Sequence, residues 1–229
     1  MSPPAGVKAI LFDAGGTLIH LDGERVCRAA GVEPDAAAFT RAEAESTAAM
    51  RAWILENPRS TDAERVPLFL DGILRRLGIA DDERRRAAAH AVGKEHARAN
   101  LWSRGGEGGR ETLAALRLRG YRVGVVSNAD GRVRRLLEQA GLSPFLEVVI
   151  DSAEVGVEKP DPRIFFAATE RLGIESTSCA YVGDIYEIDV VGARAAGMHP
   201  ILIGSSSVPE SVTPVDRIRE LGELLSMFA

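Results

Sequence analysis

The stretch "LFDAGGTLIH", residues 11–20, joins a short apolar run to a turn of small residues. The run it completes, "VKAILFD" (7–13), is β-prone, has the length of a buried strand and ends at Asp13. Gly15 and Gly16 follow, and glycines let a backbone approach a ligand closely because they carry no side chain. A carboxylate placed here can attack phosphorus as a nucleophile, although an ordinary Asp-Gly turn has the same residues.

Four further apolar runs also lead into polar or small residues. They are "YRVGVVSN" (121–128), "EVVI" (147–150), "CAYVGD" (179–184) and "HPILIG" (199–204), with helical patterns between them. Strand alternating with helix predicts an α/β fold with a doubly wound parallel sheet. Ligands of such sheets bind outside the carboxyl ends of the strands, so the polar residues that end these runs are expected to converge.

A helix-rich block separates the first strand from the second. Amphipathic patterns predict helices over residues 35–57, 64–79 and 81–102, and no clear strand is expected in this block. We therefore expect residues 20–103 to form an inserted α-helical cap, and residues 1–19 and 104–229 to form a Rossmann-like core. Residues 19–21 and 103–109 are the expected hinges between them.

Composition limits the function. The chain has 229 residues, a net charge of −5 and a pI of about 5.5, which argue against a nucleic-acid partner. No apolar run reaches the ~18 residues of a membrane helix, and the N-terminus "MSPPAGVKAILFD" lacks a signal-peptide pattern. We expect a cytoplasmic monomer or small homo-oligomer with two reduced cysteines. The tail "VDRIRELGELLSMF" (215–228) predicts a final helix, and the serine-rich segment 204–214 predicts a loop.

Two segments suit an anionic ligand. Ser127 and Asn128 offer a hydroxyl and backbone amides at a strand-to-helix junction, which fits an anion but also an ordinary helix cap. Lys159 is one of only three lysines and precedes Pro-Asp-Pro, which places it in an extended loop. It can balance a phosphoryl group and a carboxylate, or it can be a solvated surface residue.

The segment "GDIYEID" (183–189) offers a metal site. Carboxylates near a strand end are what Mg²⁺ prefers, with Asp184 as the direct ligand and Asp189 as a direct or supporting one. Asp189 alone is also explained as a carboxylate at a helix start. Together with Asp13, an anion cradle and a lysine, these residues supply what phosphoryl transfer requires.

Four segments resemble the motifs of the haloacid dehalogenase-like hydrolase superfamily in order and spacing. They are "LFDAGGTL" (11–18), "VVSN" (125–128), "EKPDPRIF" (158–165) and "YVGDIYEIDVVGARAAGM" (181–198). The resemblance implies a Rossmann-like core with a helical cap, Mg²⁺ dependence and a small phosphorylated substrate. It implies an aspartyl-phosphate on Asp13, contacts of Ser127, Asn128 and Lys159 with the phosphoryl group, and a metal held by Asp13, the carbonyl of Gly15, Asp184 and Asp189.

One position departs from the family. Its phosphatases carry a second Asp two residues after the nucleophile, which protonates the leaving oxygen and then activates water, and here that residue is Gly15. General acid–base help is worth about 10²–10⁴-fold. His20, with an ordinary pKa of about 6.5, is an alternative acid or base, and a substrate with a good leaving group needs none.

Other activities follow from the same departure. A family member that binds a phosphate ligand or a partner protein without turnover is the main alternative. Dehalogenases and phosphonatases also lack the second Asp. The retained "GD" at 183–184 argues against dehalogenation, and the late position of the only cap lysine, Lys94, argues against a phosphonatase. The sequence therefore predicts a Mg²⁺-dependent phosphatase acting on a small phosphate ester.

Overall fold

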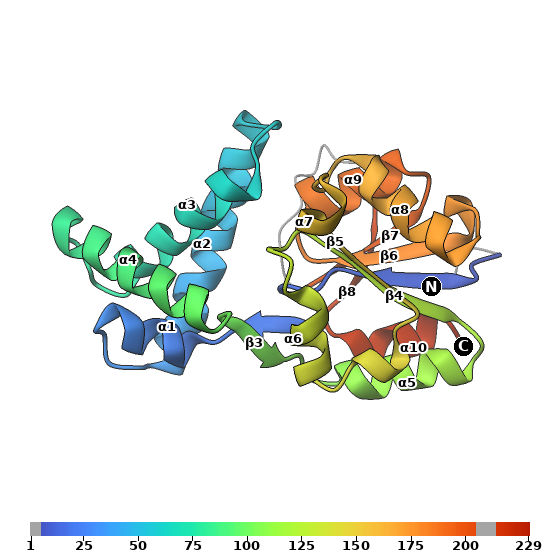
Figure 1. Ribbon diagram of the computed structural model, residues 1–229, viewed down its shortest axis with the longest axis horizontal. Helices are drawn as coiled ribbons and strands as arrows, with labels where there is room; N and C mark the ends of the chain where they lie inside the picture. Colours follow the sequence, from blue (N-terminus) through green and yellow to red (C-terminus); the bar gives the residue numbers. More distant parts are fainter. Residues whose placement is uncertain (1–5, 205–213) are drawn as a thin grey trace. The chain divides into compact units, whose positions relative to one another are not determined.

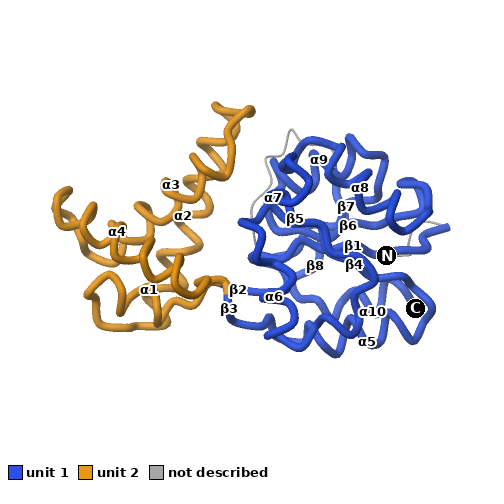
Figure 2. The backbone as a smooth tube through the Cα atoms, viewed as in Figure 1, with its two compact units in different colours: residues 1–20, 103–229 blue, residues 21–102 orange. Residues whose placement is uncertain are grey.

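The computed structural model describes residues 6–204 and 214–229, shown as ribbons in Figure 1. The chain divides into two compact units, Met1–His20 with Ser103–Ala229, and Leu21–Trp102 (Figure 2). Of the serine-rich segment 204–214, residues 205–213 lie outside the described residues. No helix within the described ranges is long and apolar enough to cross a membrane.

The first unit is built on a six-stranded parallel sheet with the order β5-β4-β1-β6-β7-β8. The strands are β1 (Ala9–Phe12), β4 (Arg122–Ser127), β5 (Val148–Asp151), β6 (Cys179–Gly183), β7 (His199–Ile203) and β8 (Asp216–Ile218). The five apolar runs predicted as strands are therefore confirmed. They are buried almost throughout because helices cover both faces of the sheet, which is why they are continuously apolar.

Helices α7 (Ser152–Val155), α8 (Pro162–Leu172) and α9 (Val191–Ala195) cover one face of the sheet. Helices α5 (Gly109–Leu118), α6 (Val133–Gln139) and α10 (Leu224–Met227) cover the other (Figure 1). A π-helical turn, η3 (Tyr186–Val190), follows β6, and short 3₁₀ turns span Ser143–Phe145, Ser176–Ser178 and Leu221–Glu223. The predicted doubly wound α/β fold is confirmed.

Strand β1 lies at the point where the strand order reverses. From β1 the chain places β4 and β5 on one side and β6, β7 and β8 on the other, and Phe12 pairs with both Val125 and Val182. Ligands of open α/β sheets bind outside the carboxyl ends of the strands at such a switch point. Asp13, the residue after β1, stands there.

The second unit is helical. It contains α1 (Gly23–Ala30), α2 (Ala36–Glu56), α3 (Asp62–Arg76) and α4 (Asp82–Arg98). Asp22, Asp35 and Asp81 accept hydrogen bonds from the first turns of α1, α2 and α4, which is how short polar side chains start helices. The three predicted helices are confirmed to within a few residues, whereas α1 was not predicted.

Two predictions about secondary structure are wrong. No clear strand was expected in residues 20–103, but β2 (Ile19–Leu21) pairs with β3 (Trp102–Gly105) in a two-stranded sheet; the hinge at 103–109 stays a prediction. The tail was expected to be one helix, but Asp216–Ile218 forms β8, in register with Ile201–Ile203 of β7. Pairing with an open sheet edge outweighs a weak local helix preference, and Gly222 weakens that preference further.

Candidate active site

Asp13 stands at the carboxyl end of the central strand. Its backbone N–H donates to the carbonyl of Val182 in β6 at 2.8 Å, so the end of the sheet fixes its position. The residue is 7% exposed. Burial raises the pKa of its carboxyl group to about 6; Asp189 adds to the rise and Lys159 opposes it.

Lys159 is the buried cation of this site. It lies in the loop between α7 and α8, and only 2% of it is exposed, so it is not a solvated surface lysine. Its Nζ donates to Asp13 Oδ1 at 2.6 Å, to Asp189 Oδ1 at 2.7 Å and to the hydroxyl of Tyr181 at 2.9 Å. Burial alone would lower its pKa, but Asp13 and Asp189 outweigh burial and raise the pKa well above its ordinary value. The side chain is therefore an ammonium ion at neutral pH.

Three carboxylates gather beside this ammonium. One oxygen from each of Asp13, Asp184 and Asp189 lies within 4.8 Å of the others. Asp189 is in the π-helical turn η3, and its second oxygen accepts from the backbone N–H of Ile185 at 2.9 Å. Asp184 differs, because its Oδ1 is buried and has no hydrogen-bond partner among the described residues. Burial, together with Asp189 and Asp13, raises the pKa of Asp184 well above its ordinary value.

Two glycines allow the carboxylates to approach the backbone. Gly16 has a φ of +81°, and a Cβ there would lie 2.4 Å from Oδ2 of Asp184. A Cβ on Gly183 would lie 2.3 Å from Cγ of Asp189. Real Cβ atoms do not come this close to other atoms, so any side chain at either position would displace a carboxylate. The glycines of both motifs therefore shape the acidic cluster directly.

The cluster fits a divalent cation. If all three carboxylates are ionised beside one ammonium, the largely buried site carries two net negative charges, which is costly unless they are offset and is why the pKa values of Asp13 and Asp184 are raised. Carboxylate oxygens are ligands that Mg²⁺ prefers, and the buried Oδ1 of Asp184 has no hydrogen-bond partner in the part of the chain that the structure describes. The donor set and the orphaned oxygen thus both suit an oxygen-seeking metal ion.

Ser127 is the last residue of strand β4 and Asn128 follows it, and the two residues differ in their contacts. Ser127 ends β4, is buried, and its hydroxyl donates to the carbonyl of Asn128 at 3.3 Å. It is not a helix cap, because α6 begins at Val133 with Arg132 before it. The side chain of Asn128 binds the backbone of Lys159, donating to its carbonyl at 3.1 Å and accepting from its N–H at 2.7 Å. The contacts of both residues with a phosphoryl group stay predictions.

Gly15 and His20 flank the turn that follows Asp13. Gly15 forms an isolated bridge with Ile19, and it is not among the described glycines with a positive φ, so its backbone tolerates other residues. His20 lies in β2 with its Nε2 close to Gly106. Burial and the nearby Arg104 lower the pKa of His20, which keeps the imidazole neutral at pH 7. The metal contact of Gly15 and the acid–base role of His20 stay predictions.

Sequence reasoning missed Tyr181. Its hydroxyl accepts from Lys159 and donates to the carbonyl of Val126 at 2.7 Å. The available signal was the tyrosine hydroxyl inside the otherwise apolar run that precedes Asp184 in "CAYVGD", because a buried tyrosine hydroxyl usually has a hydrogen-bond partner.

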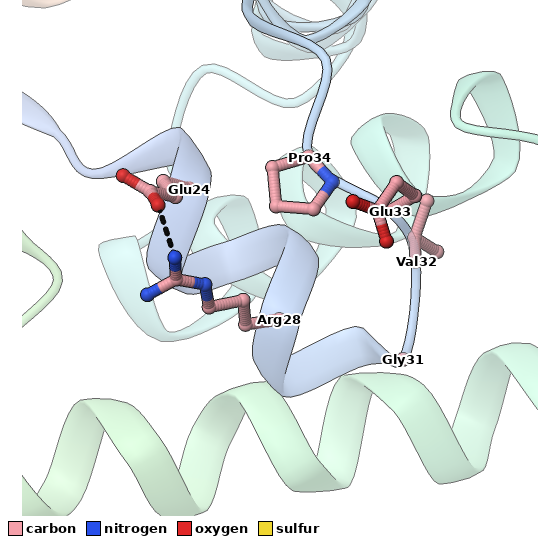
Figure 3. Close-up of a pocket in the computed structure, with 6 residues that line it drawn as sticks. All are labelled: Glu24, Arg28, Gly31, Val32, Glu33 and Pro34. Atoms are coloured by element: carbon pink, nitrogen blue, oxygen red, sulfur yellow. Dashed lines mark hydrogen bonds and ion pairs between the residues drawn. The ribbon is translucent and has the colours of Figure 1, made fainter.

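A separate hollow lies in the helical unit (Figure 3). Six residues of α1 and the turn that follows it form its lining: Glu24, Arg28, Gly31, Val32, Glu33 and Pro34. Arg28 forms an ion pair with Glu24, and both side chains are mostly exposed to solvent. The charged residues of this hollow, Glu24, Arg28 and Glu33, are all exposed to solvent and none is buried, so it does not compete with the Asp13 cluster as an active site.

Comparison with known proteins agrees with this geometry. The chain belongs to the haloacid dehalogenase-like hydrolase family, whose model it matches over residues 7–197. Haloacid dehalogenase-like hydrolase domain-containing protein 3 of Bos taurus is 42% identical over 108 residues, 47% of this chain and 42% of that protein. The chain thus spans less than half the length of that relative.

Two relatives cover more of the chain. Phosphatase MT3486 of Mycobacterium tuberculosis is 32% identical over 206 residues, 87% of this chain and 88% of that protein. Glyceraldehyde 3-phosphate phosphatase of Methanopyrus kandleri is 34% identical over 176 residues, 71% of this chain and 73% of that protein. The family identified from the four motifs is confirmed.

Solved structures share the fold across nearly the whole chain. A phosphatase from Thermococcus onnurineus is 25% identical with a TM-score of 0.61, covering 97% of this chain and 98% of its own. A dehalogenase with an intermediate has a TM-score of 0.68 at 23% identity, with 96% of each chain covered. A hydrolase of Bacillus subtilis bound to magnesium has a TM-score of 0.67 at 19% identity, covering 97% of this chain and 98% of its own. The fold is common to phosphatases and dehalogenases, so only the site distinguishes these activities.

Proposed function

We propose that this chain is a magnesium-dependent phosphatase that cleaves a small phosphate ester through an aspartyl-phosphate on Asp13. The observation that carries the proposal is the pairing of a buried nucleophile, held by Lys159 at 2.6 Å, with the orphaned oxygen of Asp184 in the same acidic cluster. The names of the relatives from M. tuberculosis and M. kandleri support phosphate-ester hydrolysis. The magnesium in the B. subtilis structure supports the choice of metal.

In this mechanism the carboxylate of Asp13 attacks phosphorus. A bond forms between a carboxylate oxygen and phosphorus as the bond from phosphorus to the alcohol oxygen breaks, and water then hydrolyses the acyl phosphate to inorganic phosphate. Lys159 orients the carboxylate and balances the charge of the phosphoryl oxygens, and Ser127 contributes a hydroxyl to the same group. Asn128 fixes the backbone of Lys159 and places its own main chain beside the phosphoryl group.

Asp13, Asp184 and the carbonyl of Gly15 are the groups that would hold magnesium, with Asp189 in support because Lys159 and Ile185 already occupy its two oxygens. When bound, the ion supplies positive charge that offsets the carboxylates and the phosphoryl oxygens. The protein's own part is to keep these oxygens together, which Gly16 and Gly183 achieve by lacking side chains.

The proton for the leaving alcohol is the unusual part of the reaction. Gly15 has no side chain that could donate a proton. The pKa of His20 is lowered, so its imidazole is neutral at pH 7 and suited to accept a proton from water rather than to donate one. We therefore propose that the first step works best on esters with good leaving groups. If His20 is the base for the second step, His20→Ala slows hydrolysis of the acyl phosphate by about 10²-fold or more. Unchanged turnover in that variant removes His20 from the mechanism.

Residues 20–103 are the proposed cap, whose side chains select the substrate. The competing function is a family member that binds a phosphate ligand or a partner protein without turnover. Dehalogenation is disfavoured by the acidic cluster at Asp184, and a phosphonatase by the absence of an early cap lysine, as Lys94 is near the end of α4.

The deciding experiment is phosphate release in Mg²⁺ from p-nitrophenyl phosphate and from alkyl phosphates. We expect the natural protein to cleave the activated ester and to fail on alkyl esters, and Gly15→Asp to gain the alkyl esters. Gly15→Asn is the matched control, because it has the same size and no proton to transfer. Asp13→Asn reports any contaminating activity. Absence of release from every ester, in protein shown to bind Mg²⁺, would favour the binding protein.

A further inference from the structure

We infer that Tyr181 is a positioning residue that orients the ammonium group of Lys159 toward the nucleophile Asp13. The kinetic part of this inference rests on the proposed function, whereas the orientation of Lys159 does not. Among the described residues, Tyr181 has no hydrogen bond to Asp13 or Asp184. Its hydroxyl lies 3.4 Å from Oδ1 of Asp189, an oxygen that Lys159 binds more closely, at 2.7 Å. Tyr181 therefore acts through Lys159.

The direction of the hydrogen bonds is fixed by chemistry. The carbonyl of Val126 can only accept, so the single hydroxyl proton of Tyr181 is donated to it at 2.7 Å. The oxygen of the same hydroxyl is then left to accept from Nζ of Lys159 at 2.9 Å. The hydroxyl therefore joins Val126, the residue before Ser127 in strand β4, to the buried lysine.

The phenol ring is held rigidly. Tyr181 belongs to β6, opposite Leu11 of β1, and is 1% exposed. Its ring packs edge-to-face on Phe165 of α8, with centroids 4.9 Å apart. The position of the hydroxyl is thus fixed by three elements: its own strand β6, the carbonyl of Val126 in β4 and the ring of Phe165 in α8. Lys159, by contrast, lies in a loop.

The hydroxyl supplies what the carboxylates alone do not. An ammonium group has three N–H donors, and Asp13, Asp189 and Tyr181 provide three acceptors in different directions. Three fixed acceptors set both the position and the rotation of the group. Tyr181 does this as a neutral acceptor, because burial raises its pKa well above the ordinary value, so it adds no charge to an already anionic site.

The composition of the chain makes a direct test practical. Only Lys8, Lys94 and Lys159 carry side-chain ammonium groups, so lysine labelled with ¹⁵N gives three such signals. In the natural protein we expect the Lys159 signal to be the one protected from exchange with water and to show a nuclear Overhauser contact with the ring of Tyr181. This measurement needs no variant and no turnover. A protected signal without that contact would overturn the inference.

Tyr181→Phe then removes the hydroxyl and keeps the ring. We expect the Lys159 signal to shift and exchange faster while those of Lys8 and Lys94 stay, and kcat for p-nitrophenyl phosphate to fall roughly 10-fold with KM changed less than about twofold. Tyr121→Phe, at the amino end of β4, is the matched control and should change neither readout.

The outcomes separate the two hypotheses. An unchanged Lys159 signal in Tyr181→Phe refutes the positioning role, whatever the activity. If the Lys159 signal changes but kcat does not, Tyr181 supports the structure of the site without affecting the reaction, and this outcome also refutes the positioning role. If the natural protein hydrolyses no ester, the proposed function fails, and the nuclear Overhauser contact still decides whether Tyr181 orients Lys159.

Discussion

Gly16→Ala tests the claim that a missing side chain shapes the metal site. Gly16 has a φ of +81°, and the carboxylate of Asp184 occupies the space that a Cβ at this position would need. The substitution adds one methyl group and no charge. Two separate costs follow from it, one for the backbone and one for the carboxylate.

Both costs can be sized. An alanine held in the left-handed region costs roughly 1–2 kcal/mol of unfolding free energy. The added Cβ would lie 2.4 Å from Oδ2 of Asp184, against 3.4 Å for the shortest ordinary contact, so the carboxylate must retreat by the difference, 1.0 Å. A misplacement of about 1 Å at a catalytic centre can cost about 10²-fold in rate.

Gly120→Ala separates the two costs. Gly120 has a φ of +88° and nothing within 4 Å of its missing Cβ, and it precedes β4 at the other end of the sheet. We expect urea unfolding to show a similar loss of stability in both variants. Only Gly16→Ala should bind Mg²⁺ more weakly by calorimetry and lose about 10²-fold in kcat. Equal Mg²⁺ affinity and equal kcat in the two variants would refute the reasoning.

Three further predictions concern single charges. Lys159→Met should abolish turnover and, without metal, lower the free energy of unfolding in urea by about 3–5 kcal/mol, because it leaves buried carboxylates unpaired. Asp184→Asn should raise the melting temperature in EDTA, because burial raises the pKa of the folded carboxyl group and ionising it in the folded state costs stability. The gain should grow as the pH rises above the ordinary pKa of an aspartate, and a gain that does not change with pH would contradict it. Arg25→Ala should cost the helical unit about 1.5–3 kcal/mol by chemical unfolding, because Arg25 binds Glu95 and two carbonyls after α4. Arg28→Ala, which breaks an exposed pair, should cost about 0–1 kcal/mol.

The sequence predicted the strands well because buried parallel strands are continuously apolar. It predicted the long cap helices because aspartates at positions 35 and 81 mark their starts. It failed where the partner segment decides the structure. Residues 216–218 become a strand only because the edge of β7 is open to them, and β2 and β3 are short strands that are paired only with each other.

The site shows the same division. Asp13 and Asp184 could be placed at one sheet edge because each directly follows an apolar run. Asp189 follows five residues after Asp184, and Lys159 was placed in an extended loop by the Pro-Asp-Pro after it. The structure brings them within hydrogen-bonding or ligand distance. The partners of each atom could not be predicted. The link from Tyr181 to Lys159 depends on contact between two side chains 22 residues apart, one in strand β6 and one in a loop, which no local pattern encodes.

Gly15 has an electrostatic consequence as well as a kinetic one. With Lys159 charged and all three carboxylates ionised, the site would carry two net negative charges, which one divalent cation can offset. A second Asp at position 15 would bring a further negative charge close to this buried cluster. Gly15→Asp should therefore gain proton transfer at the expense of stability without metal, since like charges at short range in a poorly solvated site repel strongly.

Gly15→Asp and Gly15→Asn distinguish charge from size. The backbone at Gly15 accepts both residues, because its φ is not positive. In EDTA at pH 8 we expect the Asp variant to melt at a lower temperature than the Asn variant, and Mg²⁺ to narrow that gap because the ion offsets the added charge. Equal melting temperatures in EDTA would mean that residue 15 is too far from the three carboxylates, or too well solvated, to share their field. In that case Gly15 would limit only the protonation of the leaving group, and the net charge of the acidic cluster would not depend on residue 15.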